Sequence, residues 1–395
     1  MKLLVIADDI PRPDEASGDL RLFALLRLLA QAHEVRLCLS NPAAIAQAPG
    51  DAKQRLIDAG IFLGDVNVQQ MLKHFKPDVV WFEFYHQARL DYLRLIDRYC
   101  PTAHLLIDSV DVHFNRLDAR AGLTGRPEDI TKARDIRARE LAAYAKADMV
   151  IAVSHDDREL LRRELPNVAV EVVPNIHALS PFPDLSKRRY GELVFVGGFK
   201  HHPNVDAMQY FCRDVLPLIA REKPEVQLKI IGSNPPAEIL TLASKHVEVV
   251  GYVPETAPYL ETAYISVAPL RYGGGMKGKV GEAMSHGLPV VTTSFGAEGF
   301  GLEPGRDFLL GDTPGDFAAQ VITLLDDPDL YNRVARSGYE FIQKHYSVPA
   351  VEQILKSSLG RLARLPRRKI PPMRRVMAHA HNLYARHLAW RLSRQ

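Results

Sequence analysis

Short runs of apolar residues alternate with amphipathic segments along the first 175 residues of the chain. Runs with the apolar character of buried parallel strands occur at residues 2–7, 34–39, 78–84, 104–107, 148–154 and 169–173. Between these runs apolar residues recur at helical spacing, as Leu22, Leu25 and Leu29 do within residues 19–32. Strands that alternate with helices in this way predict a doubly wound α/β domain with a parallel sheet.

The same alternation starts again after a segment without periodicity. Further strand-like runs lie at residues 192–196, 227–231, 247–253 and 265–269. Residues 176–190 contain Pro181 and Pro183, and we interpret them as an interdomain linker. The pattern therefore predicts two Rossmann-like domains, at residues 1–175 and 191–348.

One more helix is predicted after the second domain. Ser347 and Pro349 are helix start signals for residues 349–365, and Pro366 ends that segment. Residues 366–395 form a separate tail.

The glycine-rich stretch at residues 271–299 is the strongest candidate for binding chemistry. Gly273, Gly274 and Gly275 follow a predicted strand and precede a predicted helix, and this arrangement lets backbone amides approach an anion such as phosphate. Lys277 and Lys279 stand in the first helical turn, where the helix dipole already disfavours a cation. A strong anion between the two lysines would explain their position. The alternative is a glycine-rich turn with solvated lysines and no ligand.

Glu282 follows on the same predicted helix, deeper than the lysines. A carboxylate at this position repels phosphate but accepts hydrogen bonds from a pair of ribose hydroxyl groups, as the ribose-binding acid of dinucleotide folds does. The alternative is a solvent-facing helix glutamate.

Residues 271–299 resemble the donor-binding motif of the GT-B glycosyltransferases, in particular the retaining family 4, or glycosyl transferases group 1. The match is strongest at residues 282–291, where a Glu-Ala-Met sequence is followed by Gly287 and by Pro-Val-Val. The family's motif has a further glutamate eight positions before Glu282, and this chain has Gly274 there. The resemblance implies two domains that face a cleft, with the last helix crossing back onto the first domain.

The resemblance also implies roles for residues outside the motif. The loop after the strand at residues 104–107 is similar to a family loop that contacts the donor sugar, and Asp111 and His113 are its candidates. Family members neutralise the diphosphate with an Arg and a Lys after the first strand of the second domain. This chain has Lys200 there without the arginine, so Lys277 and Lys279 are expected to take over that charge. Glu298 is a candidate for recognising the donor sugar.

The loop at residues 8–18 follows the first predicted strand but lacks the Gly-x-Gly-x-x-Gly pattern of dinucleotide-binding domains. In the GT-B enzymes that the chain resembles, the equivalent loop faces the cleft, and the resemblance therefore makes Gly18, Asp19 and Arg21 candidates for contacting donor phosphate or acceptor. Asp111 and His113 lack a third ligand at a suitable spacing, so a metal site is disfavoured. We expect a metal-free enzyme without a cofactor.

Composition narrows the class of protein. With 395 residues, 47% hydrophobic and 25% charged, the chain has the make-up of a soluble globular protein, and no apolar run is long enough to span a bilayer. The start of the chain is too quickly acidic for a signal peptide. Cys38, Cys100 and Cys212 are widely spaced and odd in number, so we expect a reducing cytoplasm.

Positive charge is concentrated in the last part of the chain, which follows Glu352 and includes the tail at residues 366–395. Eleven Lys and Arg residues and no acidic residue follow Glu352; because the whole chain carries +3, the rest carries −8. From Arg374 onward, apolar residues such as Met377 and Tyr384 recur at helical spacing, which is typical of a helix on an anionic membrane surface. Nucleic acid is the rival anion, but no base-reading motif accompanies the charge. The alternative is a tail that packs on the acidic body or is disordered.

The sequence therefore predicts a glycosyltransferase that moves a sugar from a nucleotide-diphosphate donor to a hydroxyl of a glycan or lipid-linked acceptor. Retention of configuration and a role in bacterial surface polysaccharide synthesis follow from the resemblance. Two alternatives stay open: a nucleotide-sugar epimerase or hydrolase, and a non-catalytic GT-B module that binds glycan or protein.

Overall fold

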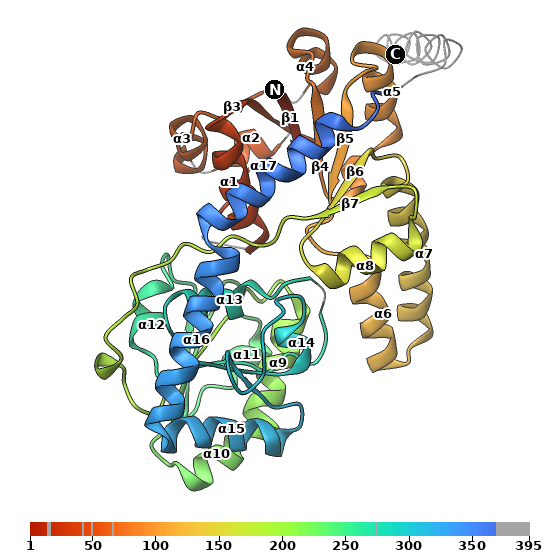
Figure 1. Ribbon diagram of the computed structural model, residues 1–395. Helices are drawn as coiled ribbons and strands as arrows, with labels where there is room; N and C mark the ends of the chain where they lie inside the picture. Colours follow the sequence, from red (N-terminus) through yellow and green to blue (C-terminus); the bar gives the residue numbers. More distant parts are fainter. Residues whose placement is uncertain (14–16, 42, 49, 65–66, 274, 369–395) are drawn as a thin grey trace.

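The computed structural model describes residues 1–395 except 14–16, 42, 49, 65–66, 274 and 369–395. Two α/β domains lie one above the other (Figure 1). The first contains a parallel sheet of seven strands in the order β3-β2-β1-β4-β5-β6-β7, and the second a parallel sheet of six in the order β10-β9-β8-β11-β12-β13. The predicted pair of doubly wound domains is confirmed.

The strands of the first domain are β1 (Lys2–Ala7), β2 (Glu34–Leu39), β3 (Phe62–Leu63), β4 (Val79–Glu83), β5 (His104–Asp108), β6 (Met149–Ala152) and β7 (Ala169–Val172). Its helices are α1 (Ser17–Ala30), α2 (Ala44–Gln47), α3 (Gly50–Asp58), α4 (Val68–Phe75), α5 (Leu90–Tyr99), α6 (His113–Thr124), α7 (Pro127–Tyr144) and α8 (His155–Glu164). Both faces of the sheet are buried under apolar side chains, which explains why its strands lack an alternating polar pattern.

The strands of the second domain are β8 (Glu192–Val196), β9 (Gln227–Ile231), β10 (Val247–Gly251), β11 (Ile265–Ala268), β12 (Val290–Thr292) and β13 (Leu309–Leu310). Its helices are α9 (His202–Tyr210), α10 (Leu216–Glu222), α11 (Ala237–Leu240), α12 (Ala257–Thr262), α13 (Gly278–Ser285), α14 (Ser294–Ala297), α15 (Pro314–Asp326) and α16 (Pro328–Tyr346).

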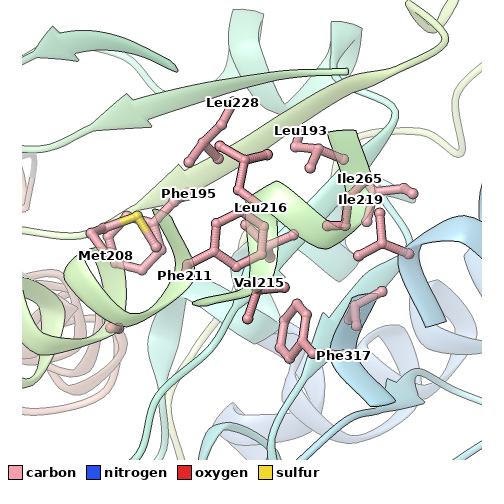
Figure 2. Packing of buried hydrophobic residues seen from close by; sticks show 14 of the residues in the cluster. Leu193, Phe195, Met208, Phe211, Val215, Leu216, Ile219, Leu228, Ile265 and Phe317 are labelled. Atoms are coloured by element: carbon pink, nitrogen blue, oxygen red, sulfur yellow. The ribbon is translucent and has the colours of Figure 1, made fainter. Parts of the chain in front are cut away.

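Large apolar side chains fill the space between the second sheet and the helices on one of its faces. Phe195 of β8 and Phe211 lie in the same fully buried cluster as Phe317 of α15, and the rings of Phe211 and Phe317 meet edge to face with centroids 5.7 Å apart (Figure 2). The sequence predicts one helix from Pro203 to about residue 221. The structure instead has a π-helical turn over Phe211–Val215 between α9 and α10.

The sequence also predicts that Ser154 caps a helix over residues 155–164, and this cap is confirmed at the start of α8. The Ser154 hydroxyl oxygen accepts a hydrogen bond from the backbone N–H of Asp157 at 3.0 Å, and the hydroxyl donates to the Asp157 carboxylate at 2.9 Å. This cap begins the helix at His155, where the sequence places it.

The last described helix, α17 (Val348–Arg364), leaves the second domain and packs on the first (Figure 1). Val351, Leu355, Leu359 and Leu362 belong to the core cluster that covers one face of the first sheet. The predicted crossover is confirmed. The interdomain linker runs beside the junction of α16 and α17, because the backbone N–H of His177 donates to the carbonyl oxygen of Tyr346 at 2.9 Å.

Candidate functional site

A cavity of about 810 Å³ lies between the two domains. Its walls come from loops at the carboxyl ends of strands in both sheets, which is the edge where doubly wound sheets bind ligands. The loop between β11 and α13 forms much of the wall on the second domain. The start of α1 and the loop after β5 form the wall on the first domain.

The glycine loop lies directly against the first domain. Gly275 has φ +59°, a left-handed conformation that glycine adopts without strain. A Cβ atom at this position would lie 3.5 Å from the carbonyl oxygen of Val110 and 3.7 Å from the Cα atom of Asp111. Gly273 also lines the cavity, whereas Gly274 lies outside the described residues.

Lys277 occupies the N-cap position of α13 and already has partners. Its Nζ atom donates to the carbonyl oxygen of Gly275 at 2.8 Å and to the Glu298 carboxylate at 2.9 Å. The Lys277 side chain is only 5% exposed. A buried cation at the positive end of a helix is unfavourable by itself, and Glu298 compensates it.

Lys279 lies in the first turn of α13. Its Nζ atom donates to the Asn204 amide oxygen and stands 4.3 Å from the centroid of the Phe195 ring. Burial lowers the pKa of Lys279 to about 7, while Glu282 raises it and Lys277 lowers it. The ammonium group is therefore only partly protonated near neutral pH, and a bound anion would favour the charged form.

Glu282 lies one turn further along α13 and also lines the cavity. Its carboxylate accepts a hydrogen bond from the Thr256 hydroxyl. Burial raises the pKa of Glu282, and the Thr256 hydrogen bond and Lys279 oppose that rise. The second domain thus presents a helix start with two lysines to the cavity and, beside it, a carboxylate that accepts a hydrogen bond from a hydroxyl group.

On the first domain, Gly18, Asp19 and Arg21 line the cavity. The Arg21 guanidinium is 2% exposed; its Nη1 atom donates to the Asp108 carboxylate at 2.6 Å and Nη2 donates to the Val173 carbonyl oxygen at 2.8 Å. This buried ion pair joins α1 to the end of β5. Arg21 therefore stabilises the cavity wall of the first domain, and its charge is already paired with that of Asp108.

The loop after β5 is strained where it meets the cavity. Val110 has φ +54°, and a β-branched residue in the left-handed region costs about 1–3 kcal/mol. This turn brings Asp111 to the cavity wall. The Asp111 carboxylate lies 3.1 Å from the Nε atom of Arg116, so it too has a cationic partner.

His113 begins α6, and its ring packs against two aromatic side chains. The ring centroid lies 5.4 Å from that of Tyr85 and 5.6 Å from that of Phe84. Burial lowers the pKa of His113 to about 4, so the imidazole is neutral at pH 7. The backbone N–H groups of His113 and Phe114 donate to the Glu140 carboxylate at 3.1 and 2.9 Å.

Solved structures of other proteins share this arrangement of domains. The chain superposes on sucrose-phosphate synthase of Thermosynechococcus elongatus with a TM-score of 0.70 and 15% identity, over 92% of this chain and 99% of that one. Anabaena HepE, solved with UDP and glucose, superposes with a TM-score of 0.64 and 14% identity, over 91% of this chain and all of that one. Staphylococcus aureus TarM matches with a TM-score of 0.59 and 16% identity, over 75% of this chain and 58% of that one. The chain has the GT-B fold.

Part of this GT-B chain also matches at the level of sequence. Residues 191–327, which hold the glycine loop and α13, match the family model described as Glycosyl transferases group 1. An uncharacterized 44.6 kDa protein in the cps region of Klebsiella pneumoniae is 27% identical over 163 residues. That alignment covers 39% of this chain and 42% of the relative.

The GT-B cleft brings most of the sequence-predicted site residues together. The predicted residues that line the cavity are Gly18, Asp19, Arg21, Asp111, Lys200, Gly273, Gly275, Lys277, Lys279 and Glu282. Glu298 reaches the site through its ion pair with Lys277. His113 is not among the cavity-lining residues, and its ring packs against Tyr85 and Phe84.

Sequence reasoning missed Asn204 and Thr256, the partners of Lys279 and Glu282. Both follow strands of the second sheet, β8 and β10, whose carboxyl ends point to the cavity. Position after a strand is therefore the signal that could have found them.

Within the described residues, no group of three or more His, Cys, Asp and Glu side chains is arranged to hold a metal ion. Metal independence and the absence of a cofactor stay predictions. Among the helices that the structure describes, none is both long enough and apolar enough to cross a membrane.

Proposed function

We propose that the protein transfers a glycosyl group from a nucleoside-diphosphate sugar to a hydroxyl of a glycan or lipid-linked acceptor. The observation that carries this proposal is the wall formed by α13, where a helix start, Lys279 and Glu282 line one cavity that the first domain closes. The match of residues 191–327 to a glycosyltransferase family model supports the same activity.

In this proposal the diphosphate lies at the start of α13. The backbone amides near Gly275 and the ammonium of Lys279 hold its oxygens, and Lys277 supplies a second positive charge. A charge-assisted hydrogen bond contributes about 1.5–3 kcal/mol, so these groups suffice to bind a diphosphate without a metal ion. Glu282 accepts the ribose hydroxyls. HepE of Anabaena, whose structure holds UDP, makes UDP the first nucleotide to test.

The acceptor lies against the first domain, beside Gly18 and Asp111. The bond between the anomeric carbon and the phosphate oxygen breaks while a bond to the acceptor oxygen forms, and the proton of the acceptor hydroxyl passes to the departing diphosphate. Negative charge grows on the departing diphosphate, and Lys277, Lys279 and the helix start stabilise it. Transfer with retention of configuration follows the resemblance to family 4, with Asp111 and Glu298 near the transferred sugar and Lys200 near the diphosphate. His113 lies outside the cavity lining, two residues after Asp111.

The proposed setting is the assembly of a bacterial surface polysaccharide or glycoconjugate at the cytoplasmic face of the membrane. The cps-region origin of the Klebsiella pneumoniae relative favours this setting. The basic tail predicted at residues 366–395 favours a membrane-bound acceptor. Residues 369–395 of this tail lie outside the described part of the chain.

The first test is a thermal-shift screen of UDP, GDP, ADP, dTDP and CMP with wild type, Lys279→Ala and the control Lys245→Ala. Lys245 is exposed and is not among the residues that line the cavity. A nucleotide at 100 times its dissociation constant adds about 2.7 kcal/mol to the free energy of unfolding. We expect one diphosphate to raise the melting temperature of wild type and control but not of Lys279→Ala.

Incubation with the matching nucleotide sugars then separates the candidate activities. Release of free sugar without an acceptor identifies a hydrolase, and a changed sugar still bound to nucleotide identifies an epimerase. Transfer that needs an added membrane or glycan extract identifies the transferase. No thermal shift with any nucleotide would favour the non-catalytic binding module.

A further inference from the structure

Basic side chains gather at the edge of the first sheet that lies opposite the cavity. The amino ends of the parallel strands and the carboxyl ends of α4 and α5 meet at this edge, as does the end of α17 (Figure 1). Hydrogen bonds to backbone carbonyl oxygens join segments at this edge. The Lys2 ammonium donates to the carbonyl oxygen of Phe75 at the end of α4 at 3.5 Å, and the Arg367 guanidinium donates to the carbonyl oxygen of Thr102 at 3.1 Å.

We call this surface the basic face. It consists of Lys73, Lys76, Arg98, Arg364, Arg367 and Arg368. Lys73, Lys76, Arg364 and Arg367 are exposed. The exposed cations of the face therefore come from two segments far apart in the chain, the end of α4 and the end of α17, and Arg98 of α5 lies half-buried between them in sequence.

The acidic residues at the same edge are already engaged. Asp97, 7% exposed, lies 3.0 Å from the Arg368 guanidinium, and Asp78 accepts the backbone N–H of Lys2 at 2.9 Å. Asp148 accepts the backbone N–H of Leu105 at 2.7 Å. These carboxylates serve the fold, so they compensate the exposed cations of the face only in part.

The chain leaves the described residues from this face. Arg368 is fixed to Asp97 of α5, and the following residues 369–395 hold six Lys and Arg residues and no Asp or Glu. Their sequence also contains apolar residues between the cations, including Met377, Leu388 and Trp390. Positive charge with interspersed apolar side chains suits an anionic lipid surface better than a nucleic acid.

We propose that the basic face docks the protein on an anionic lipid bilayer with the cavity directed away from the lipid. The inference names the membrane partner of the proposed function, but the docking itself does not require catalysis. The length of the strands of the first sheet sets the distance between the cavity and the lipid, because the cavity lies at the carboxyl ends of these strands and the basic face at their amino ends. Six residues of β1 at about 3.3 Å each hold the cavity roughly 20 Å from the lipid.

Vesicle sedimentation with the full chain tests the proposal. The vesicles are phosphatidylcholine alone and an equimolar mixture with phosphatidylglycerol, at about 0.1 M and about 1 M salt, between which the Debye length falls from about 10 Å to about 3 Å. We expect binding only to the mixed vesicles and only at the lower salt. The triple variant Lys73→Glu, Lys76→Glu, Arg98→Glu should bind at least about 100-fold more weakly, since each cation near an anionic surface contributes about fivefold and three such factors multiply to about 100-fold.

A second triple variant carries the same change of charge far from the face. Lys187→Glu, Lys245→Glu and Arg333→Glu alter exposed positions of the linker and second domain, and this variant should keep wild-type binding. Both triple variants should keep the nucleotide-induced thermal shift, because none of the substituted residues lines the cavity. Loss of that shift in the variant of the basic face would show that it is misfolded. Single substitutions at Lys73 and at Lys76 would then replace the triple variant.

Three results would overturn the proposal: equal binding to phosphatidylcholine alone, equal loss in both triple variants, or retention by duplex DNA as tight as by the mixed vesicles. Each can occur whether or not the protein transfers sugar. The docking proposal and the proposed function therefore fail separately.

Discussion

The Nζ atom of Lys277 lies 2.9 Å from Oε2 of Glu298, so the lysine at the start of α13 is neutralised before any donor arrives. The pair joins two segments of the second domain that lie 21 residues apart in the chain. In the binding mode proposed above, a diphosphate at this helix start would compete with Glu298 for the same ammonium group. Glu298 is therefore expected to weaken nucleotide binding while it holds Lys277 in place.

Glu298→Gln should bind the nucleoside diphosphate more tightly. The substitution removes the competing charge but keeps the shape, and one freed charge-assisted contact of about 1.5 kcal/mol corresponds to roughly a tenfold gain. Titration calorimetry with the diphosphate measures the change. Glu303→Gln is the matched control, because Glu303 is an exposed carboxylate paired with Arg306. Weaker binding by Glu298→Gln would instead make Glu298 itself a ligand contact.

Nucleotide affinity should fall as the pH rises above 7. Burial lowers the pKa of Lys279 to about 7, so deprotonation above this value removes a positive charge from the site. A bound diphosphate favours the charged form, and binding above pH 7 must therefore take up a proton. Calorimetry at pH 8 in buffers of different ionisation enthalpy detects that uptake.

Lys279→Arg tests the assignment of this proton, because arginine stays charged across the range. Its affinity should vary little between pH 6 and pH 9, whereas the wild type loses at most about tenfold per unit. A wild-type affinity independent of pH would show that Lys279 does not face the anion.

Gly281→Ala should destabilise the protein although alanine favours helices. A Cβ atom at Gly281 of α13 would lie 2.2 Å from Nε2 of the buried His177 ring. Overpacking of this kind costs about 1–3 kcal/mol, more than the ~1 kcal/mol that alanine gains over glycine in a helix. Thermal unfolding measures the difference.

Gly360→Ala is the control for that experiment. Gly360 lies in α17, and no described atom comes within 4 Å of the position that a Cβ atom would take there, so this variant should gain up to about 1 kcal/mol. The double variant Gly281→Ala, His177→Ala should recover part of the loss. Equal effects of the two glycine substitutions would contradict the contact with His177.

Glu140 should make the free energy of unfolding depend on pH. Burial raises the pKa of Glu140 from 4.5 to about 7, so the folded state binds more protons than the unfolded state between these values. Stability therefore falls as the pH rises from 4.5 to 7, by at most about 3 kcal/mol from this group. Glu140→Gln should remove that part of the pH dependence, as denaturant titrations at pH 5 and pH 7.5 would reveal. An unchanged slope would assign the dependence to other groups.

The sequence predicts the elements whose signals are local. β8, β9 and α8 begin and end where apolar runs and the Ser154 cap place them. The start of α6 at His113 was missed, because its cap is the carboxylate of Glu140, 27 residues later in the chain. No pattern within a short window contains such a partner.

In the candidate site, too, the sequence indicates residues with local signals but not those that depend on contacts between distant segments. Lys279 and Glu282 are visible in the sequence because they stand at fixed distances from the glycine loop. Their partners are not, because Asn204 lies 75 residues before Lys279 and Thr256 lies 26 residues before Glu282. The strain at Val110 and the pairing of Lys277 with Glu298 also depend on contacts between distant segments. Charge compensation in a site is thus set by tertiary structure.

The backbone hydrogen bond between His177 and Tyr346, with the adjoining β-bridge from His177 to Ser347, brings both covalent connections between the domains to one place. A rotation of one domain relative to the other about an axis through these contacts changes the width of the cavity without stretching either connection. A sliding displacement would strain both connections at once. The two domains are thus joined as by a single hinge, and the least costly way to admit a donor is for them to swing apart.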